Sequence, residues 1–249
     1  MQDISRYGYG KWRNNKRQYE IDMDIFLMEL CSEQKMAQNL KLEKCIIPQL
    51  IIDELHLYRR KLSEFQDYFI AQPGIQYFEY ECFVGTGRFV IVWDISKVEK
   101  IVNNERVIRR KIKVSELYEI VDKSGFEYET KSYNAEKPPV IAYYKPFNTY
   151  VIIDGNHRIY DAYHSGKKEI EVIVLNEEQM ISSLVNKDYV VLYKIHWNLQ
   201  YIFNYLVCNI DKIRYRNQDK ENGLFILEDD KKELFRKRIL QWLLNHLSF

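Results

Sequence analysis

The sequence predicts an α+β fold, in which a mixed sheet with helices is flanked by helical regions at both ends of the chain. Two observations support this prediction. Short apolar segments separated by proline and glycine occupy the middle of the chain, which is typical of strands. Apolar residues recur every three to four positions before and after them, which is typical of amphipathic helices. We therefore divide the chain into an N-terminal helical region (1–74), a mixed α/β core (75–175) and a C-terminal helical region (176–249).

Two helices are predicted in the N-terminal region. Asp22 or Asp24 can cap a first helix over 25–30. Pro48 suits the first turn of a second helix, because a missing backbone N–H is tolerated there. This second helix is expected to stop at Pro73-Gly74. It carries an apolar stripe, which predicts a packing face, made of Ile51, Ile52, Leu55, Tyr58, Leu62, Phe65 and Phe69.

The mixed core is predicted to begin with a hairpin. Residues 76–84 and 88–93 flank Gly85-Thr86-Gly87, which favours a glycine turn between two strands. This Gly-Thr-Gly lacks the strand–loop–helix setting and the following Lys-Ser/Thr of a P-loop, so we interpret it as a turn. A short helix after Ser96 and a strand over 107–114 are expected to follow.

Three more strands and a helix complete the predicted core. They are a strand over 140–144 led by Pro138-Pro139, a turn over 145–148, a strand over 150–153, a helix from after Asp154 to Tyr163 that ends near Gly166, and a strand over 170–175. The C-terminal region is predicted to be helical again. Its last helix carries Leu234, Phe235, Ile239, Trp242, Leu243 and Leu247, a stripe expected to pack on the core or on a second subunit.

Composition and charge narrow the class of protein. Hydrophobic residues make up 46% of the chain and charged residues 29%, which is typical of soluble globular proteins. The formal net charge of +1 does not favour nucleic acid or an acidic membrane as partner. Two basic clusters are interpreted as solvated faces; they comprise Arg106, Arg109, Arg110, Lys111 and Lys113, and Lys231, Lys232, Arg236, Lys237 and Arg238.

Localisation is predicted to be cytoplasmic. No apolar run reaches the length of a bilayer span, and residues 1–17 do not resemble a secretory signal. The four cysteines are far apart and show no metal-ligand spacing, so we expect reduced, non-catalytic thiols. They are Cys31, Cys45, Cys82 and Cys208.

The loop Asp154-Gly155-Asn156-His157-Arg158 has the features of an anion site. Gly155 allows a backbone geometry that other residues avoid and lets a ligand approach the main chain. A helix that starts here turns its unpaired N–H groups and positive dipole end toward the ligand. Asn156, His157 and Arg158 add hydrogen-bond donors, and Arg158 can bind phosphate in bidentate fashion. A purely structural interpretation is also open, with Asp154 as an N-cap, Arg158 in a salt bridge and His157 in a structural hydrogen bond.

The residues around this loop follow a known order of elements. A proline-led strand (139–141), a second strand, the Gly-x-x-Arg loop, a helix containing Ala162, Gly166 and a last strand over 170–174 succeed one another. Over about residues 110–175 the chain resembles the ParB/sulfiredoxin superfamily. The resemblance implies the fold of that superfamily and a loop whose Gly155, Asn156, His157 and Arg158 hold nucleotide phosphates.

The branches of the superfamily have different activities. Chromosome-partition proteins hydrolyse CTP and clamp DNA, sulfiredoxin uses ATP to repair an oxidised cysteine, and free-serine kinases phosphorylate a serine hydroxyl. Sulfiredoxin carries a cysteine in the loop, where this chain has Asn156 and His157. No helix-turn-helix or second Glu-Asn-x-x-Arg motif follows Leu175, and the near-neutral charge argues against a DNA clamp. The serine-kinase loop, Asp-Gly-His-His-Arg, differs at one position, so this branch is nearest.

The serine-kinase resemblance also implies a catalytic base. A glutamate just after the first strand plays that role, and Glu119 is the position we match, with Glu116 as competitor. The implied chemistry is Mg²⁺-dependent phosphoryl transfer from a nucleoside di- or triphosphate to a small hydroxyl-bearing acceptor, or nucleotide hydrolysis. In it His157 and Arg158 hold phosphate, Asp154 binds Mg²⁺, and Glu119 accepts the proton.

Two other functions stay open. The loop can serve a non-catalytic module that binds a nucleotide or a DNA end, while the helical regions bind a protein partner or form a homodimer. Such a module suits a defence or mobile-element system. A nuclease is the third possibility, although it requires more carboxylates near the loop than the one extra, Asp161.

Overall fold

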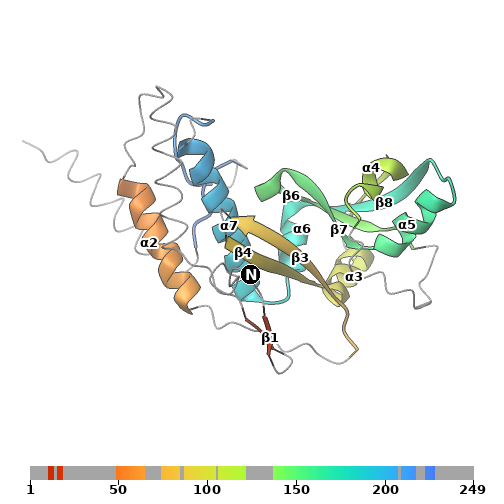
Figure 1. Ribbon diagram of the computed structural model, residues 1–249, viewed down its shortest axis with the longest axis horizontal. Coiled ribbons are helices and arrows are strands. Elements are labelled where there is room, and N and C mark those ends of the chain that lie inside the picture. Colours follow the sequence, from red (N-terminus) through yellow and green to blue (C-terminus); the bar gives the residue numbers. More distant parts are fainter. Residues whose placement is uncertain are drawn as a thin grey trace, which may run out of the picture.

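The protein is an α+β protein built from helices and mixed sheets (Figure 1). The structure is a computed structural model, and it describes residues 11–13, 16–18, 49–64, 74–84, 87–104, 106–121, 137–206, 209–216 and 222–227. Within these ranges, no helix has both the length and the apolar character needed to cross a membrane.

The largest sheet among the described residues has four strands. Its order is β5 (Ile108–Lys113), β8 (Glu169–Leu175), β6 (Val140–Tyr144) and β7 (Thr149–Asp154). β6 and β8 are parallel and the other neighbours antiparallel, so the sheet is mixed. The predicted strands are confirmed to within one residue, and the predicted turn forms the short 3-10 helix η2 (Lys145–Phe147).

Two short helices cover one face of this sheet. They are α4 (Val114–Tyr118) and α5 (Asn156–His164), and their Leu117 and Ile159 pack on Ile141, Ile152 and Val172. Because strand side chains alternate between faces, the neighbouring residues of the same strands point to the other side. Helix α4 was not predicted: the strand was expected to end at 114, and the residues that follow it were assigned no element.

The larger core lies on the other face. There Val140, Tyr144 and Ile153 of the sheet pack against a hairpin and four helices. These elements are β3 (Tyr77–Val84), β4 (Gly87–Asp94), α2 (Gln49–Glu64), α3 (Ile95–Asn104), α6 (Glu177–Ser182) and α7 (Lys187–Leu206). The antiparallel pairing of β3 and β4 confirms the predicted hairpin. In Figure 1, α2 lies beside α7 at one side of the molecule.

Several details differ from the sequence predictions or fall outside the described residues. Residues 209–216 and 222–227 are irregular apart from an isolated bridge, although the region was predicted to be helical. Two very short strands, β1 (Lys11–Arg13) and β2 (Lys16–Gln18), were not predicted. The predicted helix over 25–30, the end of the second helix, the turn residues Gly85 and Thr86, and the stripe after residue 233 lie outside the described residues.

Candidate functional site

The loop Asp154–Arg158 lies where the sequence predicts it, between a strand and a helix. β7 ends at Asp154, Gly155 follows, and α5 begins at Asn156. Gly155 has a φ of 105°, in the left-handed region that favours glycine. A bulge shifts the β6–β7 register between Val140 and Ile141, so that Asp154 pairs with Val140. The first turn of α5 therefore lies beside this end of β6 and β7.

Arg158 is folded back over the loop and paired with Asp154. Its Nη2 lies 2.8 Å from Oδ2 of Asp154, and the two side chains are only 7% and 17% exposed. A Cβ placed on Gly155 would come within 2.8 Å of Arg158 Nη2 and of Pro139 Cβ. A side chain at position 155 therefore cannot coexist with this guanidinium position, which is a second reason for glycine there.

A second cation, missed at the level of sequence, reaches the same carboxylate. Lys137 Nζ lies 3.8 Å from Oδ2 of Asp154 and 2.6 Å from Oε1 of Glu99 on α3. The signal that points to Lys137 is its position just before Pro138-Pro139, which lead β6 past the loop. Two cations and two carboxylates thus balance one another beside the start of α5.

One donor of this cluster is left unsatisfied. The Nε of Arg158 is buried and has no hydrogen-bond partner in the described part of the chain. A buried donor of this kind costs about 1–3 kcal/mol. The other donors of the loop differ in access, since His157 is exposed and Asn156 is half-buried. The loop therefore presents His157 at the surface. It also holds the buried guanidinium of Arg158, whose Nε can still donate a hydrogen bond.

The catalytic-base candidates lie on α4 and directly after it. Glu119 follows the last turn of α4 and is exposed, and Glu116 is exposed beside Lys113, 3.5 Å away. The aromatic contacts of Tyr118, which precedes Glu119, fall on Tyr160, Tyr163 and His164 of α5. These contacts place the end of α4 against the middle and last turns of α5, rather than against the first turn.

Asp154 was predicted to bind a metal ion, and the cysteines were predicted to be non-catalytic. In the described ranges, no group of three or more His, Cys, Asp or Glu side chains could hold a metal ion. Asp154, the predicted Mg²⁺ ligand, has its Oδ2 engaged by Arg158. Cys82 is fully buried, and burial raises the pKa of its thiol. Its Sγ lies 3.4 Å from the hydroxyl of Tyr144. Cys31, Cys45 and Cys208 lie outside the described residues.

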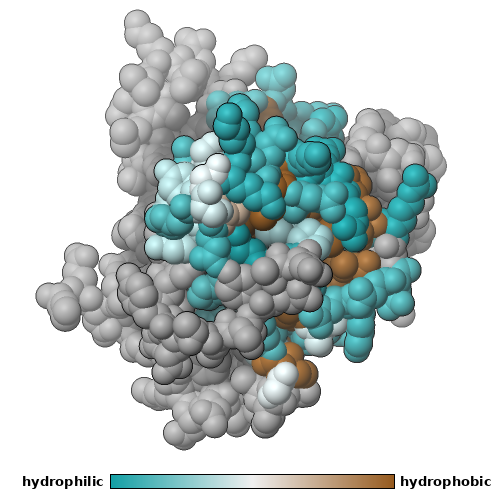
Figure 2. Space-filling view, turned by 90° about the vertical axis from the view of Figure 1, so that its right-hand side faces the viewer, coloured by the Kyte–Doolittle hydropathy of each residue, from teal (hydrophilic) through white to brown (hydrophobic). Residues whose placement is uncertain are grey.

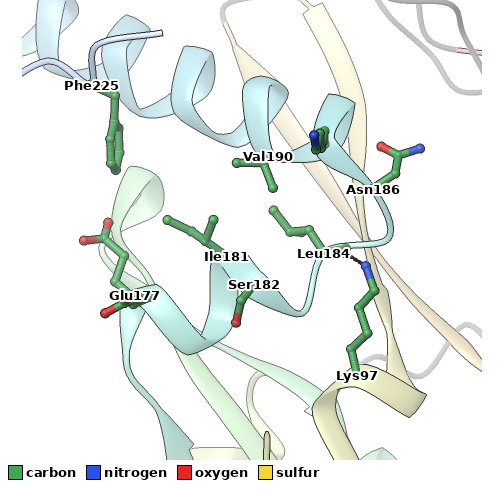
Figure 3. A pocket seen from close by; sticks show the side chains of 10 residues that line it. Lys97, Glu177, Ile181, Ser182, Leu184, Asn186, Val190 and Phe225 are labelled. Carbon is green, nitrogen blue, oxygen red and sulfur yellow. Dashed lines mark hydrogen bonds between the residues drawn. The ribbon is translucent and has the colours of Figure 1, made fainter. Parts of the chain in front are cut away.

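A separate cavity of about 650 Å³ lies between α6 and α7, away from the loop. Figure 3 shows Ile181, Leu184 and Val190 facing one another across it, with Glu177 and Phe225 at one end. At the other end Lys97 donates to the main-chain oxygen of Leu184 at 2.7 Å. Sequence reasoning assigned no role to this cavity, whose walls come from elements distant in the chain.

Comparison of the chain with protein-family models, with curated proteins and with solved structures found no match.

Proposed function

We propose that the protein binds the phosphate groups of a nucleotide at the start of α5, in a ParB/sulfiredoxin-like site. The buried, unsatisfied Nε of Arg158 carries this proposal. A helix start beside a left-handed glycine favours an anion, and a guanidinium is the side chain best suited to a phosphate. A phosphate oxygen would supply the acceptor that Nε lacks. Arg158 would then pair with the phosphate instead of with Asp154.

The neighbouring residues have consistent roles in the proposed site. Lys137 lies near enough to Asp154 to add a second positive charge, and the exposed His157 can reach a ligand from outside. Mg²⁺ would be held by Asp154 together with phosphate oxygens, because this ion is commonly bound by one or two carboxylates plus substrate phosphates. In phosphoryl transfer or hydrolysis it would neutralise charge on the phosphates.

Binding is tested by thermal unfolding with ATP, ADP, CTP or GTP, each with and without Mg²⁺. A nucleotide at ten times its Kd stabilises the folded protein by about 1.4 kcal/mol, which a melting curve resolves. We expect at least one of the four to raise the melting temperature. Unchanged melting with all four would contradict the proposal.

Arg158→Ala is expected to lower the affinity for that nucleotide about tenfold or more. The substitution removes a charge-assisted contact worth about 1.5–3 kcal/mol, and Lys at the same position should restore it only in part. Affinity is measured by titration calorimetry on protein whose folding has been checked by circular dichroism. Arg110→Ala, which removes an exposed arginine of β5, is the matched control and should bind normally. If Arg158→Ala also bound normally, the loop would be a structural turn.

A non-catalytic nucleotide-binding module is the second candidate function. The observation in its favour is the position of Glu119, at the end of the helix whose Tyr118 contacts the later turns of α5. Such a module would bind nucleotide without converting it, and it would use other surfaces for a partner.

Glu119→Gln separates the two candidates. If Glu119 is the base, nucleotide should bind as before while its turnover falls on the order of 10²-fold or more, because an amide cannot accept the proton. Turnover is measured as diphosphate formed from triphosphate. Glu116→Gln is the matched control on the same helix, and a loss confined to it would move the role to Glu116. Wild-type protein that binds nucleotide but shows no turnover would identify the module.

A further inference from the structure

A groove lined by lysines lies at the end of α5 opposite to the loop. It has a volume of about 970 Å³ and is formed by β5, β8 and the turn that connects α5 to β8. Four of its lining residues are lysines and two are glutamates, all exposed: Lys111, Lys113, Lys167, Lys168, Glu169 and Glu171. Figure 2 faces this end of the molecule, where hydrophilic side chains form most of the described surface. We refer to this feature as the lysine groove.

The surplus positive charge of the lysine groove is concentrated in the turn after α5. On the strands, Lys111 and Lys113 lie opposite Glu171 and Glu169 in the β5–β8 register, so two lysines are matched in number by two glutamates. The ion pairs there join Glu171 to Arg109 and Lys113 to Glu116. No ion pair is formed by Lys167 or Lys168 in the described part of the chain. The two lysines are thus available to a negatively charged ligand.

An oriented aromatic ring lies next to these lysines. Tyr163 lines the groove and is 43% exposed. Its ring stacks on that of Tyr118, with centroids 3.7 Å apart and planes 5° apart. The hydroxyl of Tyr118 lies 3.4 Å from Nε2 of His164, which supports the stack from α5. Tyr163 is therefore a large exposed ring whose orientation is set before any ligand binds.

We propose that the lysine groove binds single-stranded nucleic acid. Lys167 and Lys168 would neutralise backbone phosphates, and a base would stack on Tyr163. This combination of positive charge and an aromatic ring is how single strands are bound without sequence preference. A duplex buries the faces of its bases, so they cannot stack on Tyr163. An acidic peptide carries no base that could stack there. The near-zero net charge of the chain does not conflict with this proposal. Because salt screens distant charges, a phosphate interacts mainly with the charged side chains close to it.

The proposal is independent of the nucleotide site at the loop. Tyr163 lies at the last turn of α5, about 10 Å along the helix axis from Asn156. Arg158→Ala should therefore leave the binding of oligonucleotides unchanged.

The test is fluorescence anisotropy with a labelled oligothymidylate of about 16 nucleotides. At about 50 mM salt we expect a Kd of about 10⁻⁵ M or tighter, which weakens as salt is raised. Lys167→Glu with Lys168→Glu should weaken binding tenfold or more and reduce the slope of log K against log salt by about 1.4. Tyr163→Ala should weaken binding on the order of tenfold without changing that slope, and Tyr163→Phe should bind normally.

Control variants and competitors make the test decisive. Lys187→Glu with Lys212→Glu makes the same change of charge at exposed residues outside the groove and should bind like wild type. The proposal is overturned by absence of binding at about 10⁻⁴ M protein, or by an equal loss in this control. It is also overturned if duplex DNA binds as well as the single strand and Tyr163→Ala has no effect. Polyglutamate that competes as well as the oligonucleotide would show a general polyanion surface instead.

Discussion

Arg216→Ala is expected to lower the free energy of unfolding by roughly 3 kcal/mol, the lower end of what breaking a buried ion pair costs. The guanidinium of Arg216 donates to both oxygens of Glu177, at 2.9 and 3.3 Å. It also lies over the rings of Trp197 and Phe225, 4.5 and 3.9 Å from their centroids. The two charged side chains are only 12% and 18% exposed, so the loss leaves a poorly solvated carboxylate.

The environment of Glu177 sets the size and the pH range of this effect. Burial raises the pKa of Glu177, but hydrogen bonds from Arg216 and Lys145 outweigh it and hold the pKa below its ordinary value. Lys145 remains in the variant at 2.9 Å, which is why we expect the lower end of the range. Since the folded pKa is depressed, the stabilisation is present above the pKa of the unfolded chain. It is lost as pH falls through the folded value.

Urea unfolding at neutral pH measures the loss in Arg216→Ala. Arg214→Ala is the matched control, because Arg214 is exposed and belongs to the same segment. Its effect should stay within about 0.5 kcal/mol. Equal unfolding midpoints for the two variants would mean that the Arg216–Glu177 pair does not anchor residues 209–216 to α6.

A buried histidine is expected to make the protein less stable in mild acid. Burial lowers the pKa of His196 to about 3 from its ordinary value of 6.5, so the folded protein holds this ring neutral. Between these two pH values the unfolded chain binds a proton that the folded chain does not. The free energy of unfolding therefore falls as pH falls, by about 1.4 kcal/mol per pH unit. Well above pH 6.5 the ring is neutral in both states, and the stability no longer depends on His196 protonation.

The prediction is checked by urea unfolding at about pH 7 and about pH 5, where His196 alone should cost about 2 kcal/mol. His196→Gln removes the titrating ring, which accepts or donates a 2.8 Å hydrogen bond with the hydroxyl of Tyr144. The variant should be less stable at both pH values, but its difference between them should shrink by that amount. His56→Gln, at an exposed position of α2, should keep the wild-type difference. An unchanged difference in His196→Gln would contradict the assignment.

Local sequence signals were sufficient for most elements of the sheet. Pro138-Pro139 and Gly166 delimit strands and a helix because their backbones favour turns and helix ends. The helix α3 was predicted two residues late, since Asp94 caps it by accepting hydrogen bonds from the backbone N–H and hydroxyl of Ser96. α4 was missed because five residues give too little periodicity to indicate a helix.

The sequence by itself determined the local form of the candidate site. A strand, a glycine with positive φ and a helix start were all predictable at 150–158, because backbone preferences act over neighbouring residues. Only the tertiary structure decided which side chains meet there. Lys137 lies beside Asp154 and pairs with Glu99 of α3. Glu119 follows a helix, α4, whose Tyr118 contacts the middle and last turns of α5. Such contacts depend on strand order and helix packing, which join residues far apart in the chain and leave no periodic signal in it.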